Sequence, residues 1–255
     1  MNEAENGNRA LRGKAALVTG GSSGLGRATA VALARAGADV ALAARSAEDL
    51  ESAKEEVSKT GSQALALPVD LAKEDEAAWA VERTAEAFGR LDVLVNAAGT
   101  DAPGLVEELD VKGWDQTLAV NLRAPFLLSK AVFPHMREAG GGTIVNVSSV
   151  AGKKGWANAS AYCASKFGLT GLTEALADEG KEHGIRAIVL YPGAMATNWG
   201  SFSPEERRQS EPNEAPAAQA LAPEWVADFI AWFVASPPEF VLTEGIVLPI
   251  EERLP

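Results

Sequence analysis

The chain has 255 residues, 47% hydrophobic and 23% charged, which is the composition of a globular protein able to bury a large core. Its formal net charge of −12 argues against a nucleic-acid partner, because phosphate contacts need a basic surface. No apolar run approaches the roughly 18 residues of a membrane-spanning helix, so we expect no membrane partner. One cysteine and two histidines exclude an internal disulfide and argue against a His/Cys metal cluster, so we expect no metal and a cytoplasmic location.

Apolar strands and helical segments alternate along the chain after a polar stretch, 1–12, that we expect to be a flexible tail. The expected strands are 14–20, 39–44, 63–70, 91–99, 142–149, 185–193 and 244–249. The expected helices are 25–37, 46–61, 74–89, 110–138, 160–182 and 223–236, and Ser46 is a capping candidate at the start of the acidic helix 46–61. This alternation predicts an α/β fold with a single doubly wound, Rossmann-type parallel sheet of about seven strands and helices on both faces. We expect one domain over 13–255, with a mobile substrate loop at about 198–222.

A glycine-rich turn joins the first expected strand to the first expected helix. It reads TGGSSGLG, from Thr19 to Gly26. Glycines let the backbone turn sharply and approach a ligand closely, and the N-terminus of the following helix favours an anion. The position of the turn therefore indicates a site for a nucleotide pyrophosphate, with a tight structural turn as the alternative.

Tyr162 and Lys166 stand four residues apart in the expected helix 160–182, so they share one helix face. A free phenol has a pKa of about 10, and a nearby positive charge lowers it by about one to three units, toward the range of a general acid or base. The alternative is a half-exposed tyrosine that lies along a lysine stem. Ser149 ends the expected strand 142–149, where open α/β sheets bind ligands, so its hydroxyl could bind a substrate oxygen.

Six motifs, in one order, resemble the short-chain dehydrogenase/reductase family from about residue 13 to 250. They are Thr19-Gly-x-x-x-Gly-x-Gly26, Asn96-Ala97-Ala98-Gly99, Asn121, Ser149, Tyr162-x-x-x-Lys166 and Pro192-Gly193. The resemblance implies that Tyr162 is the general acid and base, and that Ser149 binds the substrate oxygen. It implies that Lys166 holds the nicotinamide ribose and lowers the pKa of the tyrosine. It also implies that the backbone carbonyl of Asn121 positions a water in a proton relay, with a polar residue at a helical kink before Pro125 as the alternative.

The same resemblance implies a nicotinamide dinucleotide cofactor held by the glycine turn and by the segments that follow several strands. The implied cofactor-binding residues are Gly20, Ser22, Ser23, Gly24, Leu25, Gly26, Arg45, Ser46, Asp70, Asn96, Ala97, Gly99, Tyr162, Lys166, Pro192, Gly193, Met195 and Thr197. Asn96 is interpreted first as a support of the sheet near the cofactor.

The end of the second expected strand predicts which nicotinamide cofactor binds. In these folds an acidic residue there holds the ribose 2′-hydroxyl, whereas a nearby arginine accommodates a 2′-phosphate. Ala44 stands where the acid is expected, and Arg45 and Ser46 follow it. NADP(H) is therefore favoured over NAD(H), although Ser23 stands where some NADP-preferring relatives carry a second basic residue. Asp70 matches the family's adenine-contacting aspartate, with a helix cap as the alternative.

The resemblance implies an NADP(H)-dependent oxidoreductase that interconverts a small-molecule carbonyl and a secondary alcohol. The alternatives are a catalytically silent nicotinamide sensor or scaffold, and an epimerase or dehydratase that uses the same tyrosine and lysine. The resemblance also implies a homo-oligomer, a dimer or a tetramer, built on the helices 110–138 and 160–182. We expect the substrate to lie under the loop 198–222, near Trp156, Trp199, Phe202 and Lys153 or Lys154.

Overall fold

The computed structural model describes residues 9–197 and 220–251. Seven parallel strands form one sheet in the order β3-β2-β1-β4-β5-β6-β7. The strands are β1 Ala15–Thr19, β2 Asp39–Ala44, β3 Ala64–Pro68, β4 Val93–Asn96, β5 Gly142–Val147, β6 Ile185–Pro192 and β7 Glu244–Val247. The helices are α2 Gly24–Arg35, α3 Ala47–Ser58, α4 Glu74–Phe88, α5 Val111–Leu118, α6 Ala124–Glu138, α7 Ser160–Gly180 and α9 Pro223–Ala235. The predicted Rossmann-type parallel sheet is confirmed.

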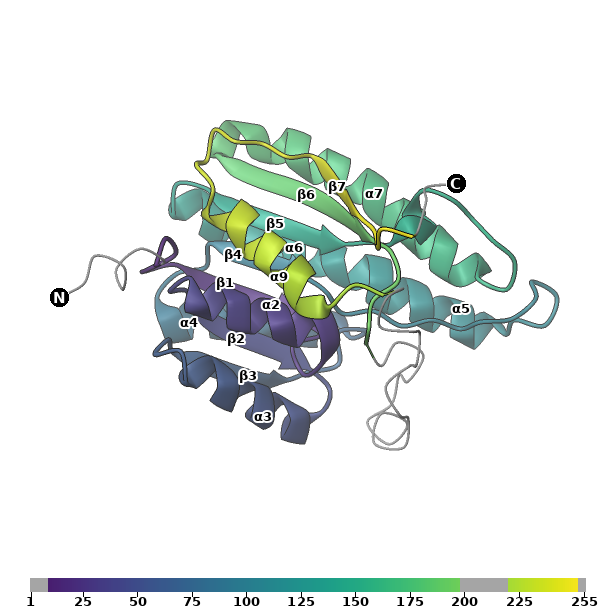
Figure 1. Cartoon of the computed structure of the whole chain (residues 1–255), viewed down its shortest axis with the longest axis horizontal. Coiled ribbons are helices and arrows are strands. Elements are labelled where there is room, and N and C mark those ends of the chain that lie inside the picture. Colours follow the sequence, from purple (N-terminus) through teal and green to yellow (C-terminus); the bar gives the residue numbers. More distant parts are fainter. Residues whose placement is uncertain (1–8, 198–219, 252–255) are drawn as a thin grey trace.

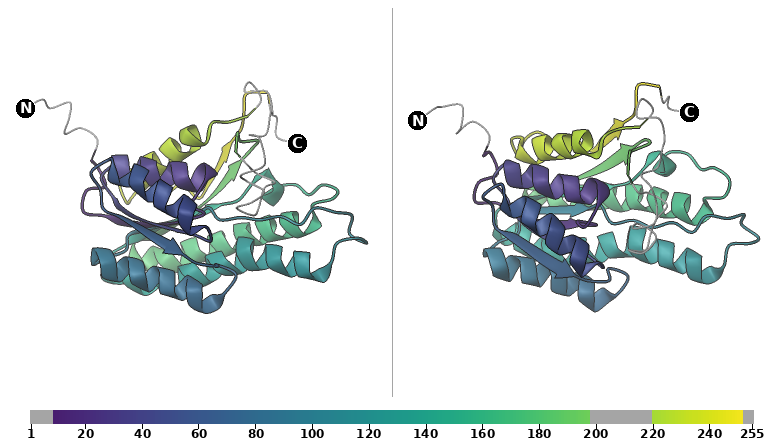
Figure 2. Two further views of the ribbon diagram at one scale, coloured as in Figure 1. Left: turned by 90° about the horizontal axis from the view of Figure 1, so that it is seen from below. Right: turned by 60° about the horizontal axis from the view of Figure 1, so that its bottom comes forward.

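Helices cover both faces of the sheet (Figures 1 and 2). Helices α2, α3 and α9 pack on one face, and α4, α6 and α7 pack on the other. Because both faces are covered, strands are buried over their whole length, as in β1 and β6. One hydrophobic cluster includes Leu33, Leu42 and Ile230, and the cluster across the sheet includes Leu17 and Leu94.

The expected helix 110–138 is two helices in the structure. A π-helical turn, Ala119–Arg123, separates α5 from α6, and the N–H of Ala124 donates to the carbonyl of Ala119 within it. Such turns carry one extra residue and widen the helix locally, a feature that hydrophobic periodicity does not reveal. The interruption centres on Asn121, one of the predicted site residues.

The packed chain begins before residue 13. Leu11 is buried, and its N–H donates to the carbonyl of Ala36 at 2.9 Å, so residues 9–12 are not a free tail. Residues 1–8 of the expected tail lie outside the described residues, as do 198–219 of the expected substrate loop. The end of that loop is packed: Leu221 is buried and pairs with Met195. Within the described ranges, no helix is long and apolar enough to span a bilayer.

The strand order reverses between β1 and β4, and this reversal positions the site. Three strands lie to one side of that point and four to the other. In open α/β sheets ligands bind in the crevice outside the carboxyl ends of the strands at such a reversal. Because all the strands are parallel, the residues that follow β1, β2, β4, β5 and β6 meet at one edge.

Candidate active site

The glycine turn after β1 is shaped by close backbone contacts. Gly20 has a φ of +67°, and a Cβ there would lie 3.0 Å from the Cα of Ala98. A Cβ at Gly26 would lie 2.3 Å from the carbonyl oxygen of Gly20, so only glycine lets α2 begin so close to the turn. The hydroxyl of Thr19 accepts the N–H groups of Ala97 and Ala98 at 3.0 and 3.1 Å, which fastens the segment after β4 to the turn.

Three strand ends converge on the glycine turn. The N–H of Gly21 donates to the carbonyl of Ala43 at the end of β2. A Cβ at Gly24 would lie 3.5 Å from the methyl group of Thr197, which follows β6. The turn therefore closes against three of the segments expected to hold a dinucleotide. The N-terminus of α2 fits a pyrophosphate, because it offers backbone N–H donors and two of its first three residues are glycines.

Arg45 and Ser46 lie directly after β2, on this same edge. Arg45 is exposed, and Ser46 caps α3 by accepting the N–H of Asp49 at 3.3 Å. The expected capping role of Ser46 is confirmed, so its hydroxyl oxygen already has one partner. Arg45 stays a predicted contact of a 2′-phosphate.

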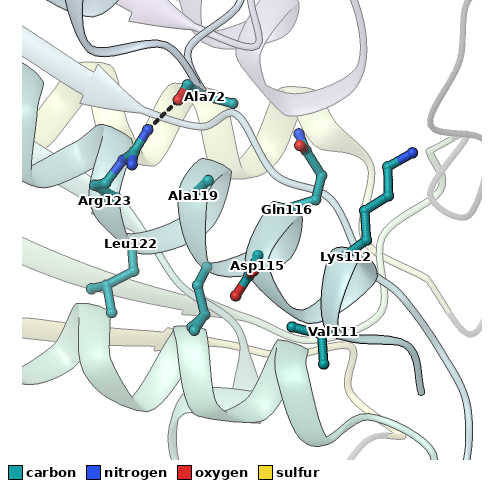
Figure 3. Close-up of a pocket in the computed structure, with 9 residues that line it drawn as sticks. Ala72, Val111, Lys112, Asp115, Gln116, Ala119, Leu122 and Arg123 are labelled. Carbon is teal, nitrogen blue, oxygen red and sulfur yellow. Dashed lines mark hydrogen bonds between the residues drawn. The ribbon is translucent and has the colours of Figure 1, made fainter. Parts of the chain in front are cut away.

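Asp70 lies in the turn after β3. Its carboxylate accepts the N–H of Ala72 at 3.1 Å, and its own N–H donates to Glu76 at 2.6 Å. These bonds shape the turn, but the residue that caps α4 is Lys73, so the helix-cap alternative for Asp70 is wrong. The adenine contact of Asp70 stays a prediction. The guanidinium of Arg123 donates to the carbonyl of Ala72, which ties this turn to the π-helical turn (Figure 3).

Figure 3 also shows a groove along α5. It is lined by Ala72, Val111, Lys112, Asp115, Gln116, Leu118, Ala119, Leu122 and Arg123. None of these residues belongs to the set predicted for catalysis or cofactor binding. We therefore place the candidate site at the strand ends and not in this groove.

Asn96 is buried in a polar chain that crosses the middle of the sheet. Its side-chain amide donates to Asn146 of β5 at 2.8 Å, and Asn146 in turn donates to the hydroxyl of Thr173 of α7 at 2.9 Å. Asn96 therefore joins β4, β5 and α7, which agrees with its interpretation as a support of the sheet.

Asn121 connects two parts of the site through its side chain. Its amide oxygen accepts the N–H of Thr100 and its amide nitrogen donates to the carbonyl of Thr100, both at 2.8 Å. The same nitrogen donates to Ser165 at 3.0 Å, and the Ser165 hydroxyl donates to the carbonyl of Tyr162 at 2.7 Å. The sequence indicated a role for the backbone carbonyl of Asn121 or a polar residue at a helical kink, so it missed this side-chain bridge.

The structure brings Ser149, Tyr162 and Lys166 together. The hydroxyls of Ser149 and Tyr162 are hydrogen-bonded to each other, and Ser149 also accepts the N–H of Ala151 at 3.2 Å. The Lys166 ammonium lies 5.6 Å from the centre of the Tyr162 ring and donates to the carbonyl of Val147 at 2.9 Å. Both Tyr162 and Lys166 are buried, so the tyrosine is not half-exposed along a lysine stem.

The protonation of this pair differs from the expectation. Burial raises the pKa of the Tyr162 phenol above its usual value, and the hydrogen bond with Ser149 offsets only part of that rise. Burial also lowers the pKa of Lys166 from 10.5 to about 8. In the chain alone the net pKa shift of the tyrosine is thus upward, because the loss of water around the phenol outweighs any effect of the lysine.

The segment after β6 lies beside the glycine turn, as the contact of Thr197 with Gly24 shows. Within it the N–H of Thr197 donates to the carbonyl of Met195 at 2.9 Å, and the N–H of Gly193 donates to Val247 of β7. Pro192 is the last residue of β6. The four predicted cofactor contacts of this segment are therefore on the ligand-binding edge.

The predicted substrate-pocket residues are less well supported. Lys153 forms a salt bridge with Glu244 at 2.5 Å, and its ammonium lies over the ring of Tyr191. Trp156 is exposed. Trp199 and Phe202 lie outside the described residues.

Asp101 was missed as a site residue. The residue before it, Thr100, is bonded to Asn121, which also holds α7 at Ser165, so Asp101 follows directly on the catalytic helix's support. The negative charge of Asp101 raises the pKa of the Tyr162 phenol. The available signal was an acidic residue two positions after Gly99, in a loop that leaves the ligand-binding edge.

A family model of the short chain dehydrogenases matches residues 14–208. The chain belongs to the short-chain dehydrogenase family. An uncharacterized oxidoreductase of Thermotoga maritima is 38% identical over 243 residues, which cover 93% of this chain and 96% of the relative. A D-threitol dehydrogenase of Mycolicibacterium smegmatis is 40% identical over 190 residues, 74% of this chain and 73% of the relative.

Solved structures of short-chain dehydrogenases share this fold. A metagenomic short-chain oxidoreductase in complex with NADP is 34% identical, has a TM-score of 0.81, and is matched over 95% of this chain and all of its own length. The sequence-based assignment to the family is confirmed. As a short-chain dehydrogenase, the protein is an oxidoreductase that acts on CH–OH or C=O groups.

Proposed function

We propose that this short-chain dehydrogenase interconverts a carbonyl and a secondary alcohol with NADP(H), and that Tyr162 is its general acid and base. The observation that supports this most is the hydrogen-bonded pair of Tyr162 and Ser149 beside the buried ammonium of Lys166. These groups follow β5 or lie on α7, at the edge where the glycine turn closes against its neighbours.

A nicotinamide dinucleotide, when bound, supplies or accepts the hydride. The chain's own residues handle the oxygen and the proton. In reduction, Ser149 donates a hydrogen bond to the carbonyl oxygen, and Tyr162 gives its phenolic proton to that oxygen as the carbonyl carbon gains hydride. The raised pKa of Tyr162 keeps the phenol protonated at neutral pH, which is the form that this donation needs. In oxidation the phenolate of Tyr162 accepts the proton from the hydroxyl of the alcohol.

Lys166 supports the proton transfer electrostatically. With a pKa of about 8, the lysine is mostly protonated at pH 7. A positive charge 5.6 Å from the ring stabilises the phenolate that remains after Tyr162 has given up its proton. In this proposal the ammonium also holds the nicotinamide ribose, and the carbonyl of Asn121 places a water through which the tyrosine regains its proton.

The replacement Tyr162→Phe tests the mechanism. It removes the proton donor and keeps the ring, so we expect turnover to fall by about 10²- to 10⁴-fold. NADPH binding should weaken far less, since the other predicted cofactor contacts remain. Tyr191→Phe is the matched control, because it removes a buried hydroxyl that bonds Thr170. NADPH consumption and NADPH fluorescence titration measure the two quantities. Near-normal turnover of Tyr162→Phe on a panel of ketones and aldehydes would refute the role of the tyrosine.

The preference for NADP(H) rests on Arg45 at the end of β2 and is supported by the relatives solved with NADP and with 5-hydroxy-NADP. We expect Arg45→Ala to weaken NADPH binding by about tenfold, since a charge-assisted contact to phosphate is lost at an exposed position. NADH lacks the 2′-phosphate and is the internal control. Equal affinity of Arg45→Ala and the natural chain for NADPH would contradict the assignment.

Two other functions of the same site are distinguished by the same assay. A silent nicotinamide sensor or scaffold would bind NADPH and consume none with any substrate. An epimerase or dehydratase would convert its substrate without net consumption of the cofactor. The hydrogen-bonded Ser149 and Tyr162 favour a site that turns over.

We further propose a single domain that also includes the packed residues 9–12, a cytoplasmic location and a homo-oligomer. The oligomer is supported by exposed apolar side chains on the helices expected to pair: Val111 of α5, Phe126 of α6 and Phe167 of α7.

A further inference from the structure

The segment 100–104 is anchored at both ends beside the catalytic helix. At one end, both backbone polar groups of Thr100 are bonded to the side chain of Asn121, which also holds α7 at Ser165. At the other end, the N–H of Gly104 donates to the carbonyl of Asn158 at 3.0 Å, and Gly104 pairs with Ala159 just before α7 begins.

The backbone of Asn158 is suited to this second anchor. Its φ is +64°, and it is the one residue other than glycine with a positive φ in the part of the chain that the structure describes. Asparagine tolerates this left-handed conformation better than most residues. The turn that it makes leads the chain into α7, four residues before Tyr162. The segment 100–104 is therefore a fixed wall of the site.

Asp101 is the charged residue of this wall. Its carboxylate is partly buried, and one oxygen accepts the N–H of Ala102 at 2.7 Å. Its other oxygen has no hydrogen-bond partner among the described residues, and Asp101 forms no salt bridge with any of them. Its charge nevertheless reaches the phenol of Tyr162.

We propose that Asp101 is a specificity-determining residue, which selects substrates that carry a hydroxyl or ammonium group near the reacting carbon and rejects substrates that carry an anion there. An ionised carboxylate only accepts hydrogen bonds, so the Asp101 oxygen that does not bind Ala102 suits a donor on the substrate. A substrate carboxylate or phosphate at that place meets a like charge in a partly dry site. This inference rests on the proposed carbonyl reduction.

Three cyclohexanones of similar size test the proposal: 2-hydroxycyclohexanone, cyclohexanone and 3-oxocyclohexanecarboxylate. We compare kcat/KM for NADPH-dependent reduction of each by the natural chain, Asp101→Asn, Asp101→Leu and the control Glu108→Gln. Glu108→Gln removes a charge at an exposed position of the same loop. We expect the natural chain and the control to prefer the hydroxyketone over cyclohexanone, and cyclohexanone over the keto acid.

Each variant changes one part of this preference. Asp101→Asn removes the charge and keeps an acceptor, so we expect the keto acid to gain about tenfold relative to cyclohexanone while the hydroxyketone stays preferred. Asp101→Leu also removes the acceptor, so we expect the preference for the hydroxyketone to fall by about tenfold or more.

The outcomes separate the two claims. If the natural chain reduces these ketones but the ratios in both variants stay within about twofold of its own, the role of Asp101 is wrong and the reductase proposal stands. A natural chain that prefers the keto acid also overturns the role of Asp101. If the natural chain reduces none of these ketones or of the wider panel, the proposed function fails, and the inference fails with it.

Discussion

The buried ammonium of Lys166 predicts a stability that rises with pH. Burial lowers its pKa from 10.5 to about 8, whereas in the unfolded chain the lysine keeps its ordinary pKa. Between these two values the unfolded state binds more protons than the folded state, so the free energy of unfolding increases with pH. At about 1.4 kcal/mol per pKa unit, the charged lysine lowers stability at pH 7 by about 3 kcal/mol.

The replacement Lys166→Met isolates this effect. It removes the titrating group and keeps an unbranched side chain, so it relieves the cost of burying the charge. It also leaves the carbonyl of Val147 without its partner, and this loss offsets about 1–3 kcal/mol of the stability gained at pH 7. The pH dependence of the unfolding free energy is therefore the quantity that isolates the effect of the lysine. We expect the natural chain to gain about 2 kcal/mol relative to Lys166→Met between pH 7 and pH 9.5, since most of the lysines in the folded state are neutral by then.

Urea unfolding of the cofactor-free protein at these two pH values measures the difference. Lys130→Met is the matched control, since it makes the same replacement at an exposed position of α6. Parallel pH profiles for the natural chain and Lys166→Met would refute the reasoning, because they would mean that the folded lysine keeps its ordinary pKa. We also expect Lys166→Met to lose most of its turnover. The buried lysine would then be needed for activity although its charge lowers the free energy of unfolding.

Two further predictions concern the two ends of the strands. Asp92 is a buried carboxylate whose pKa burial raises, but hydrogen bonds, first from Arg90, more than offset this and hold the pKa below its usual value. We expect Asp92→Asn to lose about 1–3 kcal/mol of unfolding free energy at pH 7. The difference from the natural chain should shrink as the pH falls below about 4, because the carboxylate of the natural chain is then protonated. A difference that does not change with pH would contradict this prediction. Gly20→Ala forces a Cβ to 3.0 Å from Ala98 at a φ of +67°, so we expect weaker NADPH binding and a loss of about 1–2 kcal/mol in unfolding. Gly89→Ala shares the positive φ but meets no atom within 4 Å, so it should lose stability and keep NADPH affinity; equal NADPH affinity of both variants would refute the role of the turn.

Much of the fold could be predicted from the sequence because its signals are local and repeated. Apolar runs such as 39–44 coincide with the strand β2, since a strand covered on both faces needs no polar alternation. Ser46 was recognised as a helix cap from its position before an acidic helix, and it caps α3. The π-helical turn could not be predicted, because the segment 119–123 keeps the apolar pattern of an ordinary helix while its hydrogen bonds shift by one residue.

The candidate site was predictable where spacing along one element decides the geometry. The four-residue spacing of Tyr162 and Lys166 sufficed to predict that they would be neighbours on α7. Contacts between distant segments were not predictable. The bridge from Thr100 through Asn121 to Ser165 joins three parts of the chain, and its donors and acceptors leave no periodic trace in the sequence. The upward pKa shift of the tyrosine was missed for the same reason, since burial depends on the whole fold.

The two anchors of the segment 100–104 have a consequence for the divergence of substrate preference. Asn121 holds the backbone at Thr100 and Asn158 holds it at Gly104, so neither anchor depends on the side chains at 101 and 103. Ala102 packs against α5 near Gly113 and is less free to vary. Exchange of Asp101 and Pro103 in a combinatorial library should therefore sample new substrates while the helix that carries the tyrosine and the lysine stays in place.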